Sequence, residues 1–148
     1  MKYLFLTLVL FPSISVSFAD SRNINTPENT LIAYDKAWIE MDIEGIRRCL
    51  TENAKKDFNK EHLDGLSSSE IEEFRQVMLR ILQYSKYTKN IVIEKKQISD
   101  TELHLKVRKE FYDSTFTKKY EEKMTIFIFK VEDKEWKIDS QTVKGQKK

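Results

Sequence analysis

The sequence holds few histidines and cysteines, which are common catalytic and metal-binding residues. Its two histidines are His62 and His104, and its single cysteine is Cys49. An enzyme that moves protons needs an imidazole or a carboxyl group whose pKa is shifted toward the working pH by apolar surroundings. His104 alternates with charged residues and His62 is predicted in a charged loop, so both are expected at the surface. We therefore predict no catalytic residue.

Two aspartates are the remaining candidates for acid–base chemistry, and each has a simpler role. Asp42 stands between two helical patterns, where its carboxylate can accept hydrogen bonds from the free N–H groups that begin the next helix. Asp139 alternates with the apolar residues Trp136 and Ile138, so it points away from a core that these two enter. Two distant histidines, one cysteine and no paired carboxylates predict no metal site. Three glycines in the chain leave no glycine-rich phosphate loop, so no cofactor is predicted.

Aromatic side chains are better candidates for binding than any ionisable group. An apolar pocket for a small ligand is lined mainly by hydrophobic and aromatic side chains. The alternative is that these rings form only the hydrophobic core, because large apolar residues at regular spacing are usually buried there. The five candidates for a ligand pocket are Tyr34, Trp38, Tyr112, Phe127 and Phe129.

The strand predicted at 124–131 is the element around which these residues are organised. Successive side chains of a strand alternate between its faces, so Ile126 and Ile128 share one face while Phe127 and Phe129 share the other. Both faces are apolar, which predicts a strand within a sheet that needs cover on both sides. A short polar break and a second alternating stretch follow, and this pattern predicts a hairpin.

Four helical patterns precede the strands. The first begins at Thr26-Pro27-Glu28, where threonine can cap, proline fits the first helical position, and glutamate suits the positive end of the helix dipole. The fourth begins after three serines, and Ser69 with Glu72 has capping-box spacing. From residue 89 the period alternates, with Ser99-Asp100-Thr101 as a turn. The sequence predicts an α+β domain, in which three to four N-terminal helices pack on an antiparallel sheet of about four strands.

The first 19 residues read as an export signal. Lys2 gives a positive start, an apolar run follows, Pro12 breaks it, and Ser17-Phe18-Ala19 has small residues at the cleavage spacing. The run is shorter than the roughly 20 apolar residues of a spanning helix, although an uncleaved anchor is the alternative. We expect a signal peptide at 1–19, a flexible lead-in at 20–25, one domain at 26–143 and a basic tail at 144–148. The mature protein is expected in the periplasm or outside the cell, without a stable membrane anchor.

Charge and cysteine content exclude two further classes of protein. The 26 basic and 24 acidic residues are interspersed, whereas a nucleic-acid-binding protein needs clustered lysine and arginine. One thiol forms no internal disulfide, so an exported domain of this kind depends on its core. Cys49 falls in a helical apolar pattern, which predicts a buried side chain.

The order of these elements resembles the nuclear transport factor 2-like superfamily, and most closely its small exported bacterial members of unassigned function. The resemblance covers about residues 26–143 and is carried by the Thr26-Pro27-Glu28 start, the step at Asp42 and the closing Trp136-Lys137-Ile138-Asp139. It implies a strongly curved antiparallel sheet that wraps a long N-terminal helix to form a cone. In the family, the mouth of the cone often holds a ligand or an active site, and the open face of the sheet often makes a dimer.

These observations lead to one expected function and two alternatives. We expect an exported, non-enzymatic binding module that holds a small apolar ligand in the cone, or a protein partner or second copy on the sheet. The first alternative, implied by the resemblance, is an isomerase- or dehydratase-like enzyme that acts on a small organic molecule. The second is a structural or inhibitory domain that associates with an enzyme of the cell envelope.

Overall fold

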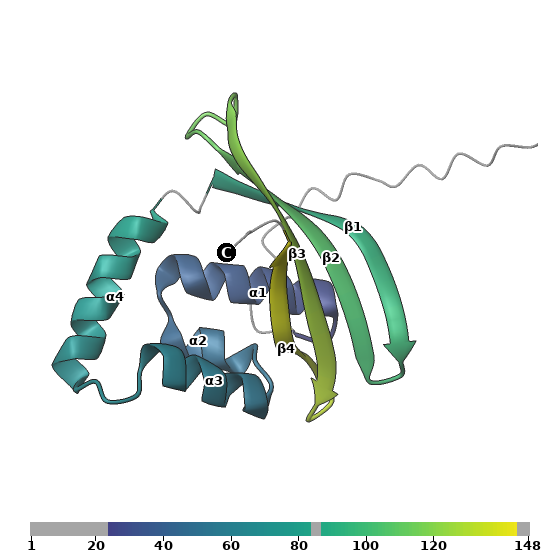
Figure 1. Ribbon diagram of the computed structural model, residues 1–148, viewed down its shortest axis with the longest axis horizontal. Coiled ribbons are helices and arrows are strands. Elements are labelled where there is room, and N and C mark those ends of the chain that lie inside the picture. The colour runs from purple at the N-terminus through teal and green to yellow at the C-terminus, as the bar shows by residue number, and fades with distance from the viewer. Residues whose placement is uncertain (1–23, 84–86, 145–148) are drawn as a thin grey trace, which may run out of the picture.

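The computed structural model describes residues 24–83 and 87–144, in which four helices are followed by a four-stranded antiparallel sheet (Figure 1). The α+β class and the predicted order of the elements are therefore confirmed. The helices are α1 (Pro27–Glu40), α2 (Ile43–Arg48), α3 (Glu52–His62) and α4 (Ser68–Leu82), and the strands are β1 (Thr88–Ser99), β2 (Glu102–Tyr112), β3 (Lys119–Glu132) and β4 (Glu135–Lys144). Within the described residues, no helix is long and apolar enough to cross a membrane.

The sheet is a meander in which each strand pairs with the next in the chain. The predicted hairpin between the last two strands has a two-residue turn, because Glu132 pairs with Glu135. Asp133 and Lys134 have φ angles of 53° and 66°, the left-handed values that a type I′ turn requires at both positions. The twist of that turn matches the twist of the flanking strands, which fixes the register of β3 against β4.

The two faces of β3 have different surroundings. Phe127 and Phe129 are 1% and 0% exposed and belong to the core that also contains Leu31 and Tyr34 of α1. Figure 1 shows the sheet curving around α1, with all four helices on its concave side. The convex side, here called the outer face, carries Ile126 and the next isoleucine along the strand, both half-buried. The predicted alternation of this strand is therefore confirmed.

The starts of the first two helices follow the predicted capping chemistry. The Thr26 side chain accepts a hydrogen bond from the Asn29 backbone N–H at 3.1 Å, and Pro27 is the first residue of α1. The helix ends at Met41, whose φ of 48° turns the chain left-handed. Asp42 then caps α2 by accepting a hydrogen bond from the Gly45 N–H at 3.0 Å.

The capping box of α4 is not at the predicted pair, Ser69 and Glu72. Ser67 and Glu70 form it instead: the Ser67 N–H donates to Glu70 Oε2 at 2.8 Å, and the Glu70 N–H donates to Ser67 Oγ at 3.4 Å. Three consecutive serines and several glutamates offer the same spacing twice, and the earlier pair adds residues to the helix. Glu72 instead accepts a hydrogen bond from the Gln76 side chain at 2.7 Å.

The pairing of β1 with β2 contains two bulges. Val92 pairs with Val107 and Glu94 with Lys106, so Ile93 has no partner between them. A second irregularity leaves Ile98 without a partner, and the two isoleucines are 43% and 46% exposed. A bulge bends the strand and increases its twist, so the regular pairing of β1 with β2 is interrupted at two points.

A short segment before α3 lies along the start of β4. Leu50 forms a parallel bridge with Ile138, where the Thr51 N–H donates to the Ile138 carbonyl at 2.9 Å and the Ile138 N–H donates to the Cys49 carbonyl at 2.8 Å. Thr51 also donates through its hydroxyl to Asp139 Oδ1 at 3.0 Å. These bonds fasten the helical half of the molecule to the last strand of the sheet.

Gly45 occupies a position in α2 where a larger residue does not fit. A Cβ atom there would lie 2.5 Å from Asp42 Oδ2 and 3.1 Å from Ala37 Cβ. Alanine normally stabilises a helix relative to glycine by about 1 kcal/mol. We expect the opposite for Gly45→Ala, a loss of about 1–2 kcal/mol in the free energy of unfolding, because the new methyl group displaces the Asp42 cap. Urea unfolding measures the loss, Asp42→Ala reports the cap alone, and a stabilised Gly45→Ala variant would contradict the steric explanation.

The thiol of Cys49 is expected to be unreactive in the folded protein. Its side chain is 2% exposed, and burial raises the pKa of its thiol from 9.0 to about 12. At a pH below both pKa values, this rise lowers the fraction of thiolate roughly a thousandfold. We therefore expect alkylation by iodoacetamide at pH 8 to be at least that much slower in the native protein than in urea. A rate close to that of the unfolded chain would contradict the buried placement.

Candidate functional site

Of the five aromatic residues that were predicted to line a pocket, three lie in the core, Trp38 packs against it and Tyr112 lies apart. Phe127 and Phe129 lie side by side in the core, with ring centroids 6.2 Å apart. Tyr34 of α1 belongs to the same core, is 6% exposed, and has the pKa of its phenol raised by burial. These three rings occupy the concave side of the sheet as packed core side chains. Trp38 packs against this core, with its ring 6.2 Å from that of Tyr34, whereas Tyr112 lies elsewhere.

Trp38 belongs to a cluster of rings that joins three helices. Its ring makes edge-on contacts with Phe58 and His62 of α3 at centroid distances of 5.9 and 6.0 Å. The His62 ring also contacts Phe58 at 5.0 Å and stacks on Phe74 of α4 at 6.0 Å. These four residues, Trp38, Phe58, His62 and Phe74, are called the aromatic–histidine cluster below.

The prediction that His62 lies in a charged surface loop is wrong. It is the last residue of α3, and its side chain is 33% exposed between the two phenylalanine rings. The spacing of Phe58 and His62 was the available signal, because residues four apart lie on the same side of a helix. The cluster attaches α4 to the rest of the molecule, together with a hydrogen bond from Arg75 Nε to the Met41 carbonyl at 3.2 Å.

Tyr112 lies at the far end of β2, beside a buried carboxylate. Its hydroxyl donates to Glu110 Oε2 at 2.5 Å, while Arg108 Nε and Lys119 Nζ lie 3.2 and 3.4 Å from Glu110 Oε1. The Tyr112 hydrogen bond, with the charges of Lys119 and Arg108, lowers the pKa of Glu110. The same bond raises the pKa of the Tyr112 phenol. Glu110 is thereby held ionised and Tyr112 neutral, which is typical of a structural carboxylate paired with basic side chains.

Asp35 is a polar residue of the concave side that the sequence reasoning missed. Lys109 Nζ of β2 lies 2.7 Å from Asp35 Oδ1, and the Asn90 side chain of β1 donates to Asp35 Oδ2. The side chains of Asp35 and Lys109 are 17% and 22% exposed. The trio holds α1 against the sheet, and its carboxylate is neutralised by the lysine. A weak signal was present, because Asp35 lies at the edge of the apolar stripe of its helix.

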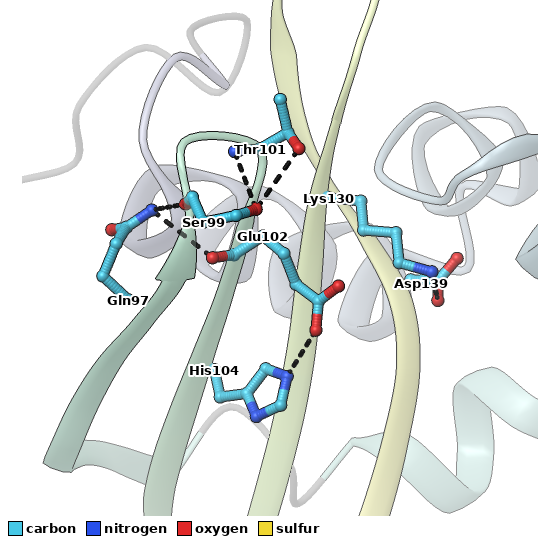
Figure 2. A network of polar contacts seen from close by, with 7 residues as sticks. All are labelled: Gln97, Ser99, Thr101, Glu102, His104, Lys130 and Asp139. Carbon is cyan, nitrogen blue, oxygen red and sulfur yellow. Dashed lines mark hydrogen bonds and ion pairs between the residues drawn. The ribbon is translucent and has the colours of Figure 1, made fainter.

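The outer face of the sheet carries pairs of opposite charge, some of which are drawn in Figure 2. His104 Nε2 lies 2.9 Å from Glu102 Oε1 on β2, and Lys130 Nζ of β3 lies 2.7 Å from Asp139 Oδ2 of β4. The hydrogen bond and charge of Asp139 raise the pKa of Lys130. The side chains of His104 and Asp139 are 31% and 19% exposed. Both residues point away from the core, as their alternation predicted.

An apolar row runs along the middle of this outer face. It consists of Met124, Ile126 and Ile128 of β3, which pair in register with Arg108, Lys106 and His104 of β2. None of the described helices lies over this side of the sheet (Figure 1). The three side chains are nevertheless only half-exposed. Their partial cover must come from neighbouring side chains of the sheet, as when the aliphatic part of a long charged side chain lies over an apolar neighbour. We call these three residues the outer row.

The described residues contain no gathering of three or more histidine, cysteine, aspartate or glutamate side chains that could hold a metal ion. The two histidines belong to different places, one in the aromatic–histidine cluster and one on the outer face. Among the described residues, His104 pairs with Glu102 on the outer face and Asp35 pairs with Lys109 on the concave side.

The comparisons with known proteins agree with the fold. No protein-family model matches the sequence, and no curated protein is significantly similar to it. The solution structure of a SEC-C motif-containing protein from Rhodopseudomonas palustris is similar, with a TM-score of 0.51 and 10% identity over 82% of this chain and 80% of that chain. The match to a crystal structure of an NTF-2-like protein of unknown function from Shewanella oneidensis MR-1 covers 78% of this chain and 93% of that protein, with 14% identity and a TM-score of 0.48.

At these identities the similarity concerns the fold alone. The fold that the resemblance to the nuclear transport factor 2-like superfamily implied, with helices first and a curved antiparallel sheet around a long N-terminal helix, is the fold observed. This fold is compatible with a binding module and with an enzyme, because one fold hosts many functions and the site decides between them.

Proposed function

We propose that the protein is a non-enzymatic binding module that docks a protein partner on the outer face of its sheet. The observation that carries this proposal is the outer row, an apolar strip of Met124, Ile126 and Ile128 with none of the described helices over it. A strand with two apolar faces needs cover on both, and α1 covers only the concave one. Burial of apolar side chains at the centre of an interface is the main source of binding energy between proteins.

The cone is less suited than the sheet to hold a ligand. The rings of Phe127, Phe129 and Tyr34 are at most 6% exposed and pack among the side chains of α1 and β2. A small apolar ligand at these candidate residues would have to displace core side chains, which are packed at the density of organic crystals. A small ligand in the cone therefore has less support than a protein partner on the outer face of the sheet.

The charges beside the outer row indicate the chemistry of the partner. Lys106 and Arg108 flank the row on β2, and Lys96 of β1 pairs with His104 on the same face. Neither Lys96 nor Lys106 forms a salt bridge with any residue that the structure describes. We propose a partner that offers an apolar ridge bordered by acidic side chains, since complementary charge speeds association and excludes other proteins.

The predicted signal peptide, which lies outside the described residues, supports an exported partner. We propose that the mature chain acts in the periplasm or outside the cell, so its partner is a protein of the same compartment. An N-terminal sequence of the purified mature protein that begins near residue 20 would support export. A full-length chain retained in the cytoplasm would remove this part of the proposal without affecting the docking face.

The docking face is tested by comparing two variants with the unchanged protein. Tagged mature protein, an Ile126→Asp variant and a Lys56→Glu control on the far side of the molecule are each incubated with exported proteins of the source cell. We expect one or more proteins that bind the wild type and the control but not Ile126→Asp, and that rebind the wild type when purified. Identical binding by all three would overturn the proposal. Native mass spectrometry adds a second test, because a co-purified small apolar molecule would favour the cone over the sheet.

The isomerase or dehydratase alternative has less support. Such an enzyme needs an ionisable group that projects into an apolar cavity. The carboxylate of Asp35 is on the concave side, but Lys109 neutralises it and Asn90 occupies its second oxygen. His104 lies on the outer face beside Glu102. No pair among the described residues has the arrangement that proton transfer on an enclosed substrate requires.

A further inference from the structure

α4 is the least covered element of the described structure. It is a 15-residue helix without a single buried residue, and its Val77 and Ile81 are 49% and 61% exposed. A helix of this length is marginally stable on its own in water, and most helices depend on the burial of one apolar face. Figure 1 shows α4 standing apart from the sheet, beside α1 and α3. The helix therefore has more apolar surface than the described part of the chain covers.

One side of α4 is attached to the rest of the molecule and another is open. The attached side carries Phe74, which stacks on His62, and Arg75, which donates to the Met41 carbonyl. Another side carries Glu73, Val77, Arg80 and Ile81. Val77 lies four residues after Glu73, three before Arg80 and four before Ile81, so it is close to all three on the helix surface. All four of these residues are exposed. They are called the α4 stripe.

The α4 stripe is complementary to itself. Glu73 and Arg80 are seven residues apart, about 10.5 Å along the helix axis, with Val77 between them. Neither charge forms a salt bridge with any residue of the described chain, although other charged residues of this helix do, such as Glu72 with Arg75. If a second α4 is laid antiparallel on the first, with a two-fold axis near Val77, each Glu73 meets the Arg80 of the other copy. The two valines then face each other at the centre.

We infer that two copies of this chain associate through an antiparallel pairing of their α4 helices. The two-fold arrangement pairs Glu73 and Arg80 of each copy with the opposite charges of the other. It also covers Val77 and Ile81, as an isologous interface does. A parallel pairing would set Glu73 against Glu73 and is disfavoured. An anionic membrane is also disfavoured as the occupant, because the N-terminal half of the helix presents Glu70, Glu72 and Glu73. This contact is separate from the outer face of the sheet, which stays free for another protein.

Charge exchange gives the first test. Sedimentation equilibrium over a concentration series is expected to show a dimer of the mature protein. Glu73→Arg and Arg80→Glu should each weaken dimerisation at least about tenfold, because like charges then face each other across the helix pair. The double variant Glu73→Arg/Arg80→Glu should restore it. Asp57→Arg and Lys56→Glu, exposed charge reversals on α3, serve as matched controls and should leave the dimer unchanged.

The double variant also separates a lost contact from a misfolded helix, because it carries both substitutions and is expected to dimerise. A wild-type protein that remains a monomer at all concentrations would overturn the inference. So would a dimer that tolerates both single reversals, or one that the double variant does not restore. The Ile126→Asp variant of the sheet should dimerise like the wild type, so this inference and the proposed docking face can fail independently.

Cross-linking tests the geometry. A Val77→Cys substitution places two thiols near the axis, and mild oxidation should link two chains through a disulfide. The native Cys49 does not compete, because it is buried and its thiol has a raised pKa. Val92→Cys on β1 is the matched control, since that valine is 43% exposed but lies on the sheet. Failure of Val77→Cys to cross-link, or efficient cross-linking at position 92 alone, would overturn the antiparallel α4 pairing.

Discussion

Replacing Phe129 by alanine is expected to lower the free energy of unfolding by about 3–5 kcal/mol. The ring is 0% exposed and lies in the middle of the sheet, where Phe129 pairs with Leu103 on one side and Ile138 on the other. Its neighbour along the strand, Phe127, has its ring centroid 6.2 Å away. Removal of the ring leaves a cavity that these neighbours cannot fill, because each is fixed by its own strand. Urea unfolding of the mature protein, followed by tryptophan fluorescence, measures the loss.

Ile128→Ala is the matched control for this prediction. Ile128 is the adjacent residue on the same strand, but it belongs to the outer row and is half-exposed. Its substitution is expected to cost only about 1–2 kcal/mol, since the stabilisation by a side chain follows the apolar area that it buries. Equal losses for the two variants would contradict the assignment of one face of β3 to the core and the other to the surface.

Trp38→Ala is expected to have the second largest effect, a loss of about 2–4 kcal/mol. Trp38 is half-buried, and its ring touches Tyr34, Phe58 and His62 at centroid distances of 5.9–6.2 Å. The aromatic–histidine cluster also attaches α4 through Phe74. We therefore expect amide hydrogen exchange to accelerate more in α4 than in β2 and β3, because the loosened cluster lets α4 open locally.

Trp38→Phe tests whether the ring contacts are responsible. The smaller ring retains part of the aromatic packing, so most of the exchange protection of α4 should be preserved. Hydrogen exchange with mass spectrometry resolves α4 from the strands. Uniform acceleration over the whole chain in Trp38→Ala would mean that the variant acts through global stability, and the cluster would not be the attachment of α4.

The sequence predicted the elements well where local chemistry decides them. Thr26 with Pro27 predicted the start of α1, and Asp42 the start of α2, because capping depends on residues within one helical turn. The alternation in β2 and β3 was visible because Leu105 and Phe127 enter a buried face from regular strands. The bounds of β1 were predicted to within a residue, but its bulges were not. Its bulge at Ile93 shifts the alternation by one residue, so the pattern no longer has a single period.

The candidate site could be predicted only in part, because side chains from distant elements meet there. Nothing in the local pattern around Asp35 indicates that Lys109 will lie 2.7 Å away. Nor does the pattern around His62 indicate that Phe74 will stack on it. Tyr112 and Phe127 share an aromatic strand pattern, but Tyr112 lies at the end of β2 and Phe127 in the core. The periodicity of α4 likewise predicts a helix correctly but does not say what covers it.

The bulged edge of β1 has a consequence for solubility. The start of β4 is occupied by the Leu50 bridge, whereas the described elements leave β1 without a neighbouring strand on its free side. A long, flat edge of this kind with exposed isoleucines would serve as a template for edge-to-edge polymerisation of many chains. The bulges at Ile93 and Ile98 break that template into short pieces whose N–H and C=O groups no longer point along one line. The same two residues that interrupt the ladder with β2 thus make the free edge of β1 a poor template for another strand.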